Sequence, residues 1–305
     1  MRDGFIKVLT EVAKNNPEVM FLTGDLGFKI FDNFITQCPK QFLNVGVAEQ
    51  SMLGVAMGMS LEGRRVLVYS IANFHIFRAL EQIRNDVCYH EADVKIVSTG
   101  GGFGYGTAGM SHHATEDLSI MRALPHMTVL TPGDAWEAIG ATQFMLNNKG
   151  PFYLSLEKSN INSQKIDEVF EFGKIRQLRD GADLTLISVG SVLSEVVLAA
   201  DILAKENIFC RVLSVHCLKP IDQDAIIRAA KETGGIITIE ENSIFGGLGS
   251  TVSEVCMENN VGSKKFTMMG LRNEFSAIVG DPTYLRHYYK LDSEAIIAKA
   301  KKLLK

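Results

Sequence analysis

The sequence has no uninterrupted apolar segment of the ~20 residues that a membrane-spanning helix needs. Residues 1–16 mix charged and apolar side chains and show no cleavage-site pattern, so they do not resemble a signal peptide. A basic excess is missing too, because 31 Lys and Arg are set against 35 Asp and Glu. We therefore expect a cytoplasmic protein that contacts neither membrane nor nucleic acid.

Cysteine is scarce, and the five residues present form no C-x-x-C pair. Their odd number and scattered positions argue against a disulfide framework or a zinc site and favour reduced thiols. Cys210, His216 and Cys217 lie close together in sequence, but their apolar neighbours favour core packing. We predict no metal ligands in this chain.

Short β-rich runs alternate with helical patterns, which is typical of parallel sheets covered by helices. The first half contains predicted strands at 19–24, 42–46, 65–70, 94–99, 127–132 and 152–157. Of the helices predicted between them, 134–146 is amphipathic. Helix 48–61 is apolar almost all round, so we expect it to be buried.

Residues 161–179 are polar and aperiodic, and we interpret them as a linker. The alternation then resumes with predicted strands at 184–190, 209–215 and 235–241, and predicted helices at 191–205, 223–232, 249–258 and 292–304. The sequence therefore predicts two consecutive α/β domains with mainly parallel sheets, residues 1–160 and 180–305.

The segment NVGVAEQ (44–50) places Glu49 in the first turn of a predicted helix, directly after a strand. A carboxylate at a helix N-terminus can be a simple cap. However, the surrounding apolar residues disfavour the charged form of a carboxyl without a partner. A carboxyl in such a setting is a candidate functional residue.

Phe74 and Phe77 directly follow the predicted strand 65–70. Ligands of α/β sheets usually bind at the carboxyl ends of the strands, so these rings are candidates for stacking on a flat heterocycle. The alternative is that the two rings, three residues apart, pack one face of a helix.

Residues 98–117 contain a formal G-x-G-x-x-G pattern at Gly104, Gly106 and Gly109. The pattern is weak evidence for a dinucleotide site, because polar residues separate the glycines from the next helix. We interpret the segment as a loop that presents His112 and His113, of which one could act as an acid, a base or an oxyanion donor. A second glycine-rich segment, 240–250, is interpreted as a tight strand-to-helix connection.

Taken in order, these segments resemble the C-terminal half of the transketolase family and of its relative 1-deoxyxylulose-5-phosphate synthase. The resemblance spans nearly the whole chain and is carried by TGDLG, FLNVGVAEQ, RALEQIRND, SHHATEDLSIMRALP and IEENSIFGGLGS. It implies a thiamine-diphosphate pyrimidine-binding domain followed by a transketolase C-terminal domain. The implied activity is the transfer of a two-carbon ketol unit from a ketose donor to an aldose acceptor.

The resemblance also implies roles in binding thiamine diphosphate. Glu49 would hydrogen-bond N1′ of the aminopyrimidine and favour the imino tautomer, whose basic nitrogen deprotonates the thiazolium carbon. Phe74 matches the ring that stacks on the pyrimidine, and Phe77 lines the same pocket. Asp25 and Leu26 match the loop that borders the cofactor.

On the substrate side, His112 matches the family histidine that faces the reacting carbons, where it would hydrogen-bond the donor's C1 hydroxyl or carbonyl. Gly100 stands where the family usually has a phosphate-contacting histidine, and Ala108 replaces an acidic residue. Lys158 replaces an arginine that grips the sugar phosphate and loses its bidentate fork. The substrate is therefore expected to be a sugar or sugar phosphate other than an ordinary pentose or hexose phosphate.

The family holds Mg²⁺ and diphosphate through a G-D-G motif followed some thirty residues later by asparagine, and this chain has no such pair. Gly24-Asp25-Leu26 is a superficial match, and Asn33 follows too soon. We expect a separate N-terminal transketolase subunit to supply this domain and the Mg²⁺, in an α2β2 heterotetramer, and the chain alone to be inactive.

Three other classes of function remain open. A pyruvate-using relative, of the 1-deoxyxylulose-5-phosphate synthase or 2-oxoacid dehydrogenase β-subunit type, would share Glu49 but release carbon dioxide. A nicotinamide-binding Rossmann protein would bind nucleotides. A non-catalytic scaffold subunit would keep the fold but show no dependence on Glu49.

Overall fold

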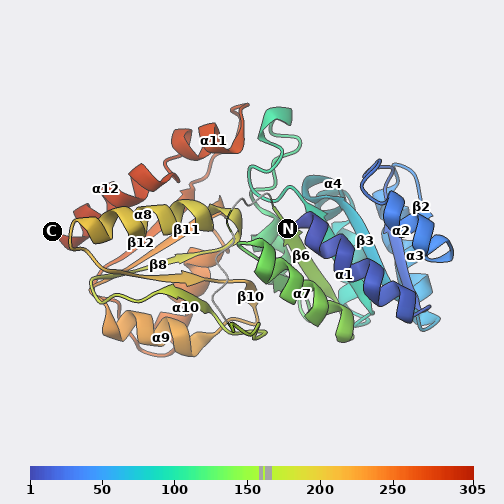
Figure 1. Ribbon diagram of the computed structural model, residues 1–305, viewed down its shortest axis with the longest axis horizontal. Helices are drawn as coiled ribbons and strands as arrows, with labels where there is room; N and C mark the ends of the chain where they lie inside the picture. The colour runs from blue at the N-terminus through green and yellow to red at the C-terminus, as the bar shows by residue number, and fades with distance from the viewer. Residues whose placement is uncertain (158–160, 162–166) are drawn as a thin grey trace.

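The computed structural model describes residues 1–157, 161 and 167–305 and shows two α/β units side by side (Figure 1). The first unit is built on a seven-stranded sheet with strand order β10-β5-β6-β4-β3-β1-β2. Its strands are β1 (Val19–Thr23), β2 (Phe42–Asn44), β3 (Arg65–Ile71), β4 (Val94–Thr99), β5 (Thr128–Leu130), β6 (Phe152–Leu156) and β10 (Cys217–Lys219). All neighbours pair in parallel except β10, which lies antiparallel to β5.

Helices cover both faces of this sheet because alternate side chains of each strand point to opposite sides. On β3, Val66 and Val68 join one apolar cluster, whereas Leu67 and Tyr69 join the other. The helical elements of this unit are α1 (Arg2–Asn15), α2 (Asp32–Gln37), η1 (Pro39–Gln41), α3 (Glu49–Leu61), α4 (Ala72–Arg78), α5 (Leu80–Gln82), η2 (Ile83–Cys88), η3 (Gly106–Ala108), α6 (Asp117–Ala123) and α7 (Ala135–Asn147).

The second unit has a five-stranded sheet with strand order β12-β11-β8-β9-β7. Its strands are β7 (Arg176–Arg179), β8 (Leu184–Ser188), β9 (Cys210–Ser214), β11 (Ile236–Ser243) and β12 (Phe266–Leu271), of which only β7 pairs antiparallel. Its helical elements are η4 (Gly190–Val192), α8 (Leu193–Lys205), α9 (Gln223–Glu232), α10 (Leu248–Glu258), α11 (Pro282–Tyr288) and α12 (Ser293–Leu304). α8 and α12 cover one face of the sheet, and α9 and α10 cover the other (Figure 1).

The predicted fold class, two α/β units with mostly parallel sheets, is confirmed. β7 nevertheless forms inside the segment interpreted as a linker, where Arg176 and Leu178 are buried and Gln177 and Arg179 exposed. The alternation spans only four residues, too few to stand out from the polar sequence around it. The predicted domain boundaries stay predictions.

The prediction that helix 48–61 is buried was wrong for one of its faces. α3 packs Met52, Leu53 and Ala56 into the core, but Val55 is 40% and Leu61 71% exposed. Among the described residues, no helix is long and apolar enough to cross a bilayer.

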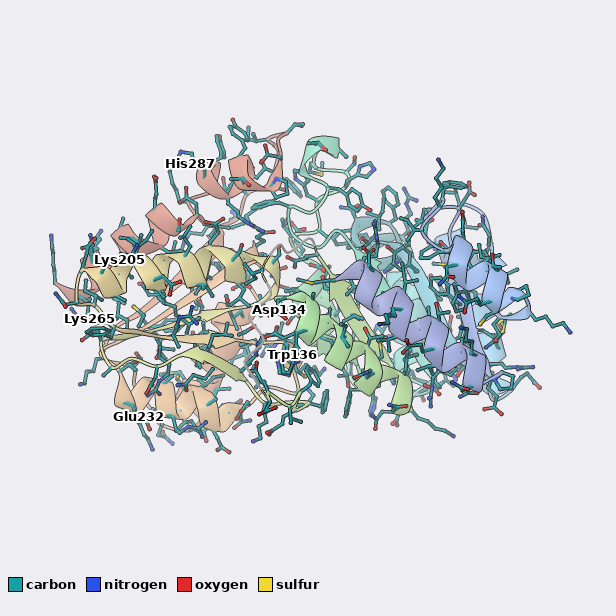
Figure 2. All side chains as sticks on the ribbon, viewed as in Figure 1. Asp134, Trp136, Lys205, Glu232, Lys265 and His287 are labelled. Carbon is teal, nitrogen blue, oxygen red and sulfur yellow. The ribbon has the colours of Figure 1, made fainter. Side chains whose placement is uncertain are left out.

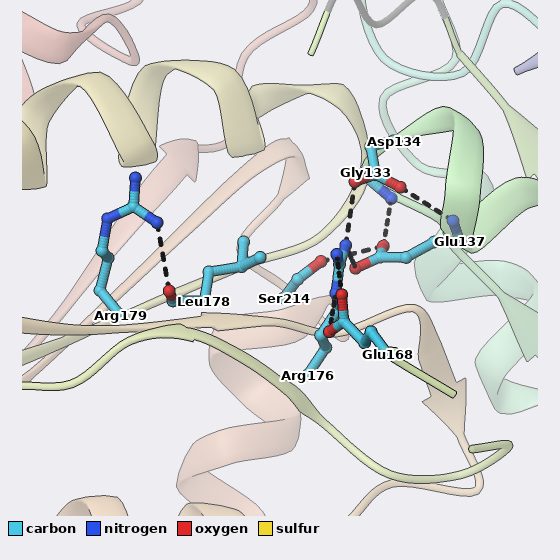
Figure 3. A network of polar contacts seen from close by, with 8 residues as sticks. All are labelled: Gly133, Asp134, Glu137, Glu168, Arg176, Leu178, Arg179 and Ser214. Carbon is cyan, nitrogen blue, oxygen red and sulfur yellow. Dashed lines mark hydrogen bonds and ion pairs between the residues drawn. The ribbon is translucent and has the colours of Figure 1, made fainter. Parts of the chain in front are cut away.

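An ionic network joins the two units where α7 begins beside β7 (Figure 3). The Arg176 guanidinium lies 2.9 Å from Asp134 and 3.2 Å from Glu137, and it makes two 2.7 Å contacts with Glu168. Glu137 also accepts from the Ser214 hydroxyl at 3.0 Å, and Arg176 stacks on the ring of Trp136 at 4.3 Å. Figure 2 places Asp134 and Trp136 at the boundary of the units, so this network fixes their relative position.

Candidate active site

The predicted site residues that the structure describes follow β1, β2, β3 and β4, whose carboxyl ends lie at one edge of the first sheet. β1 leads into the turn that contains Asp25, β3 into α4 with Phe74, and β4 into the loop that carries His112. Because these strands are parallel, their carboxyl ends bring the segments that follow them to the same edge.

Glu49 is buried in the first turn of α3, with 4% of its surface exposed. Its carboxyl has a partner that the sequence analysis did not predict, because Arg78 Nη1 donates to Glu49 Oε1 at 2.9 Å. Half of the Arg78 side chain remains exposed. The pair therefore places a buried carboxyl behind a guanidinium that solvent and ligands can reach.

Arg78 also connects Glu49 to the aromatic part of the site. Its guanidinium carbon lies 4.4 Å from the centre of the Phe74 ring, a cation–π contact. The Phe74 ring meets the His112 ring edge to face, with centroids 5.0 Å apart. Glu49, Arg78, Phe74 and His112 therefore form one continuous set of contacts.

Phe77 lies beside this set rather than within it. Its side chain is 38% exposed and lines a cavity of about 380 Å³ together with Asn73, Met110, Glu116 and Phe275. The cavity borders the loop that carries the two histidines, and the other residues lining it are His113, Thr115, Ile120 and Ser276.

Asp25 and Leu26 form a turn that is fastened to the end of β2. Asp25 has a positive φ of 58°, and its backbone N–H donates to the Asn44 side chain at 3.0 Å. Asn44 in turn donates to the Asp25 carboxylate at 3.1 Å, and the Thr23 hydroxyl donates to the Leu26 carbonyl at 3.2 Å. The turn thus stands next to the segment that leads into Glu49.

The two neighbouring histidines have different surroundings. His113 is 2% exposed, and both of its ring nitrogens lie within hydrogen-bond distance of backbone carbonyls, those of Ser276 and Gly106. His112 is only half-buried, with Nδ1 3.0 Å from the Ser111 hydroxyl. Of the pair, His113 is therefore held by backbone groups, and His112 is the more accessible.

Gly100 directly follows β4 and has a positive φ of 79°. A Cβ at this position would lie 2.1 Å from the Tyr105 ring, which also approaches His112 at 6.4 Å between centroids. Tyr105 thus takes the space that a side chain at 100 would need. The other residue predicted to bind substrate, Lys158, lies outside the described residues.

A fully buried histidine, His75, lies in the same helix as Phe74 and was missed by the sequence analysis. Its Nε2 lies 2.8 Å from the Ser98 hydroxyl, and burial lowers its pKa to about 3, so the ring is neutral at physiological pH. The only feature of the sequence that could have pointed to His75 was its position one residue after Phe74. The contact with Ser98 ties α4 to β4, so we regard His75 as support for α4.

Cys210, His216 and Cys217, which could be mistaken for metal ligands, do not form one apolar cluster, because Cys210 packs in the second unit and Cys217 in the first. Cys210 and Cys217 are free, buried thiols whose pKa burial raises to about 12. His216 has a pKa lowered by burial to about 4 and an Nε2 that lies 3.1 Å from the Glu171 carbonyl. These states fit the predicted core packing.

Comparison with known families divides the chain into two matched segments. Residues 1–164 match the family model for the transketolase pyrimidine binding domain, and residues 173–296 match that for the transketolase C-terminal domain. Among solved structures, the chain is similar to a split gene transketolase described as an inactive β4 tetramer, with a TM-score of 0.87 and 33% identity. That match covers 99% of this chain and 97% of the other.

Curated relatives match over similar lengths. An apulose-4-phosphate transketolase subunit of Phocaeicola vulgatus is 34% identical over 100% of this chain and 97% of its own length. The 6-deoxy-6-sulfo-D-fructose transketolase subunit SqwH of Clostridium sp. is 33% identical over 98% of this chain and 93% of its own. The 1-deoxy-D-xylulose-5-phosphate synthase of Desulforudis audaxviator is 29% identical, and the match covers 97% of this chain but only 47% of the synthase.

Proposed function

Because the chain belongs to the transketolase family, we propose that it is one half of a split, thiamine-diphosphate-dependent transketolase. In this proposal it transfers a two-carbon ketol unit from a ketose to an aldose, together with a separate diphosphate-binding subunit. The observation that carries the proposal is the buried carboxyl of Glu49 in one set of contacts with Phe74 and His112.

Glu49 and Phe74 suit the aminopyrimidine of thiamine diphosphate. A buried acid can donate to a ring nitrogen, and a half-buried phenylalanine offers a face for stacking. Arg78 donates to Glu49 Oε1 in this structure. In the proposal the cofactor replaces Arg78 as the partner of this carboxyl, and Glu49 is then protonated and donates to N1′. When bound, the cofactor supplies the carbon nucleophile for the donor carbonyl. Asp25 and Leu26 border the same ring.

His112 is the residue that we assign to the substrate. Its edge-to-face contact with Phe74 places the imidazole directly beside the proposed pyrimidine site. From there it hydrogen-bonds the C1 hydroxyl or carbonyl of the donor and stabilises charge as the carbon–carbon bond breaks. Ser111 orients the ring through Nδ1.

The proposed donor is a ketose with an anionic group remote from its reacting carbons. The names of two relatives include a phosphate and a sulfonate sugar, which supports an anionic substrate. Lys158 is the proposed anchor for that anion. Gly100 with Tyr105 above it gives this part of the site an aromatic wall, which favours a ketose other than an ordinary pentose phosphate.

The proposed partner is an N-terminal subunit that holds Mg²⁺ and the diphosphate of the cofactor, in an α2β2 assembly. Val47, Val55 and Leu61 support it, because these exposed apolar side chains lie directly before α3 and along it, on the helix that begins with Glu49. Gly54 and Gly58 leave the backbone of the same helix without side chains at two positions. A Cβ added at either position would meet nothing within 4 Å. A helix face of this kind suits another protein surface.

Reconstitution tests the proposal. The purified chain alone should bind thiamine diphosphate weakly and transfer no ketol unit, whereas the chain mixed with the diphosphate-binding subunit, Mg²⁺ and cofactor should do both. Size-exclusion chromatography with light scattering should then show two copies of each chain. Robust ketol transfer by the chain alone would overturn the split-enzyme proposal.

The same assay separates the pyruvate-using alternative, which the match to a 1-deoxy-D-xylulose-5-phosphate synthase keeps open. If the assembled enzyme releases carbon dioxide from pyruvate but forms no new sugar from two sugars, the transketolase assignment is wrong. If neither reaction occurs in an assembly that forms, the chain is a scaffold subunit.

A further inference from the structure

The loop that carries His112 belongs to the first unit but is anchored inside the second. Phe103, four residues beyond the end of β4, is fully buried among apolar residues of the second unit such as Leu186 and Leu285. Its ring stacks on Tyr289, with centroids 5.3 Å apart and an interplanar angle of 18°. Figure 1 shows this loop rising beside α11 of the second unit.

The backbone of the loop is fixed at the same point by Glu241 of β11. The Phe103 N–H donates to Glu241 Oε2 at 3.1 Å. Glu241 is itself 6% exposed and forms an ion pair with Arg286 of α11, whose Nη2 donates to the Ser191 hydroxyl at 2.8 Å. The acceptor for the loop is therefore held rigidly by groups of the second unit.

The far end of the loop is fastened to the segment before α11. His113 Nδ1 lies 2.8 Å from both the carbonyl and the hydroxyl oxygen of Ser276, and Gly280 N–H donates to the Gly106 carbonyl at 3.2 Å. His112 directly precedes His113, so the contacts of His113 hold the His112 backbone in place at that end. Its ring points instead to Phe74 of the first unit.

The glycines of the loop permit this close approach. A Cβ on Gly102 would lie 2.4 Å from Glu241 Oε2, and one on Gly106 would lie 2.4 Å from the Gly280 carbonyl oxygen. Side chains at these positions would push the loop away from the second unit. The glycines therefore allow the loop of the first unit to pack closely against the second unit of the same chain.

We propose that the second unit positions His112 for the reaction, and that Glu241 is the positioning residue through which it does so. Glu241 touches neither cofactor nor substrate and acts through the Phe103 backbone and the loop. The inference rests on the proposed function only in what His112 does during turnover, because the anchoring of the loop can be measured in the chain alone.

Glu241→Gln tests this role, because it keeps the size of the side chain but removes the charge that pairs with Arg286. The matched control is Glu240→Gln, at the neighbouring residue of β11, which is also buried but accepts from the backbone N–H groups of Leu248 and Gly249 in α10. In the isolated chain, the NMR signal of the His112 ring, assigned with His112→Asn, should shift in Glu241→Gln and stay in place in Glu240→Gln. Phe103→Leu, which weakens the stack on Tyr289, should also move it.

The assembled enzyme provides the second arm of the test. Glu241→Gln should lower kcat by up to about 10²-fold, as expected when a reacting group is displaced by about 1 Å. In the His112→Asn background the same substitution should have little further effect on kcat, because both changes remove one function.

The outcomes separate the two proposals. An unchanged His112 signal in folded Glu241→Gln and Phe103→Leu chains would overturn the positioning role, whatever the enzyme catalyses. Fully additive losses in the double variant would overturn it as well. A shifted signal in a chain whose assembly transfers no ketol unit would keep the anchoring of the loop and reject the proposed function. If Glu241→Gln fails to fold, Phe103→Leu decides both arms.

Discussion

At the scale of single residues, the ion pair between Glu49 and Arg78 places a condition on the binding of cofactor. The proposed pyrimidine would use the same carboxyl as the guanidinium, so we expect the pair to open when the cofactor binds. Half of the Arg78 side chain is exposed, so its guanidinium can return to water, whereas the buried Glu49 carboxyl needs the pyrimidine as its new partner.

Replacing Glu49 by Gln should leave the fold intact and slow proton exchange at the thiazolium carbon by about 10²–10⁴-fold, because the amide cannot act as an acid toward the pyrimidine. The exchange can be followed by quenched-flow NMR in the assembled enzyme. Glu62→Gln, at the exposed opposite end of α3, is the control and should exchange like the wild type. Wild-type exchange in Glu49→Gln would mean that another group activates the cofactor.

Replacing Arg78 by Met should tighten thiamine diphosphate binding to the assembled enzyme by up to about fivefold, because the competing ion pair is lost. Isothermal titration calorimetry measures this affinity. Arg84→Met, an exposed arginine further along the chain, should leave it unchanged. Weaker binding in Arg78→Met would show that the guanidinium helps to hold the cofactor instead.

The sequence indicated candidate site residues but not their contacts. Glu49, Phe74 and His112 were predicted from segments that follow strands, and parallel strands bring such segments together; their roles stay predictions. Arg78 was missed, because an arginine in a helix gives no sign of where its guanidinium reaches. The burial of Phe103 was not predicted either, because the residues that bury it belong to the second unit, far along the chain.

At the scale of elements, the glycine-rich loop and helix α3 show what sequence patterns can and cannot resolve. The prediction that the next helix begins beyond the glycines of the loop is confirmed, because α6 begins at Asp117 and polar residues separate it from Gly109. For α3, an apolar pattern predicts burial but cannot tell burial within the chain from burial against another chain. Its exposed face was therefore predicted incorrectly.

Gly102→Ala should destabilise the chain by about 2 kcal/mol or more, because alanine is strained at the positive φ of 57° and its Cβ clashes with the Glu241 carboxylate. Gly63→Ala is the matched control, with a φ of 83° and nothing within 4 Å of the added Cβ. It should cost only about 1 kcal/mol. Urea denaturation measures both, and equal losses would show that the loop adapts to the extra methyl group.

At the scale of the whole molecule, buried carboxyls link the two units and make their contact sensitive to pH. Glu137 lies in the network with Asp134 and Arg176, and Glu157 accepts from the Ser191 N–H at 2.7 Å. Burial is the main reason that the pKa of Glu137 and of Glu157 is raised to about 7. The sequence showed two domains but not this contact, because Glu137 looks like an ordinary first-turn acid of α7.

The raised pKa of Glu137 predicts how pH affects stability. The folded chain holds the Glu137 proton up to about pH 7, whereas the unfolded chain releases it near the ordinary value of 4.5. Between these values the folded state binds more protons, so this carboxyl lowers the free energy of unfolding as pH rises, by at most about 1.4 kcal/mol per pH unit. Above pH 7 the contribution is constant.

Glu137→Gln removes this titration, so the variant should gain stability relative to the wild type as the pH rises from about 5 to 7. The comparison matters because His75 and His216, whose pKa values burial lowers, change wild-type stability in the opposite direction over part of that range. Both histidines remain in the variant, so their contributions cancel when the free energy of unfolding of the wild type is subtracted from that of the variant. Urea denaturation at half-unit pH steps gives that difference. The control is Glu258→Gln, at an exposed acid at the end of α10, for which the difference from the wild type should not change with pH. A Glu137→Gln curve parallel to the wild type would mean that Arg176 keeps Glu137 ionised throughout.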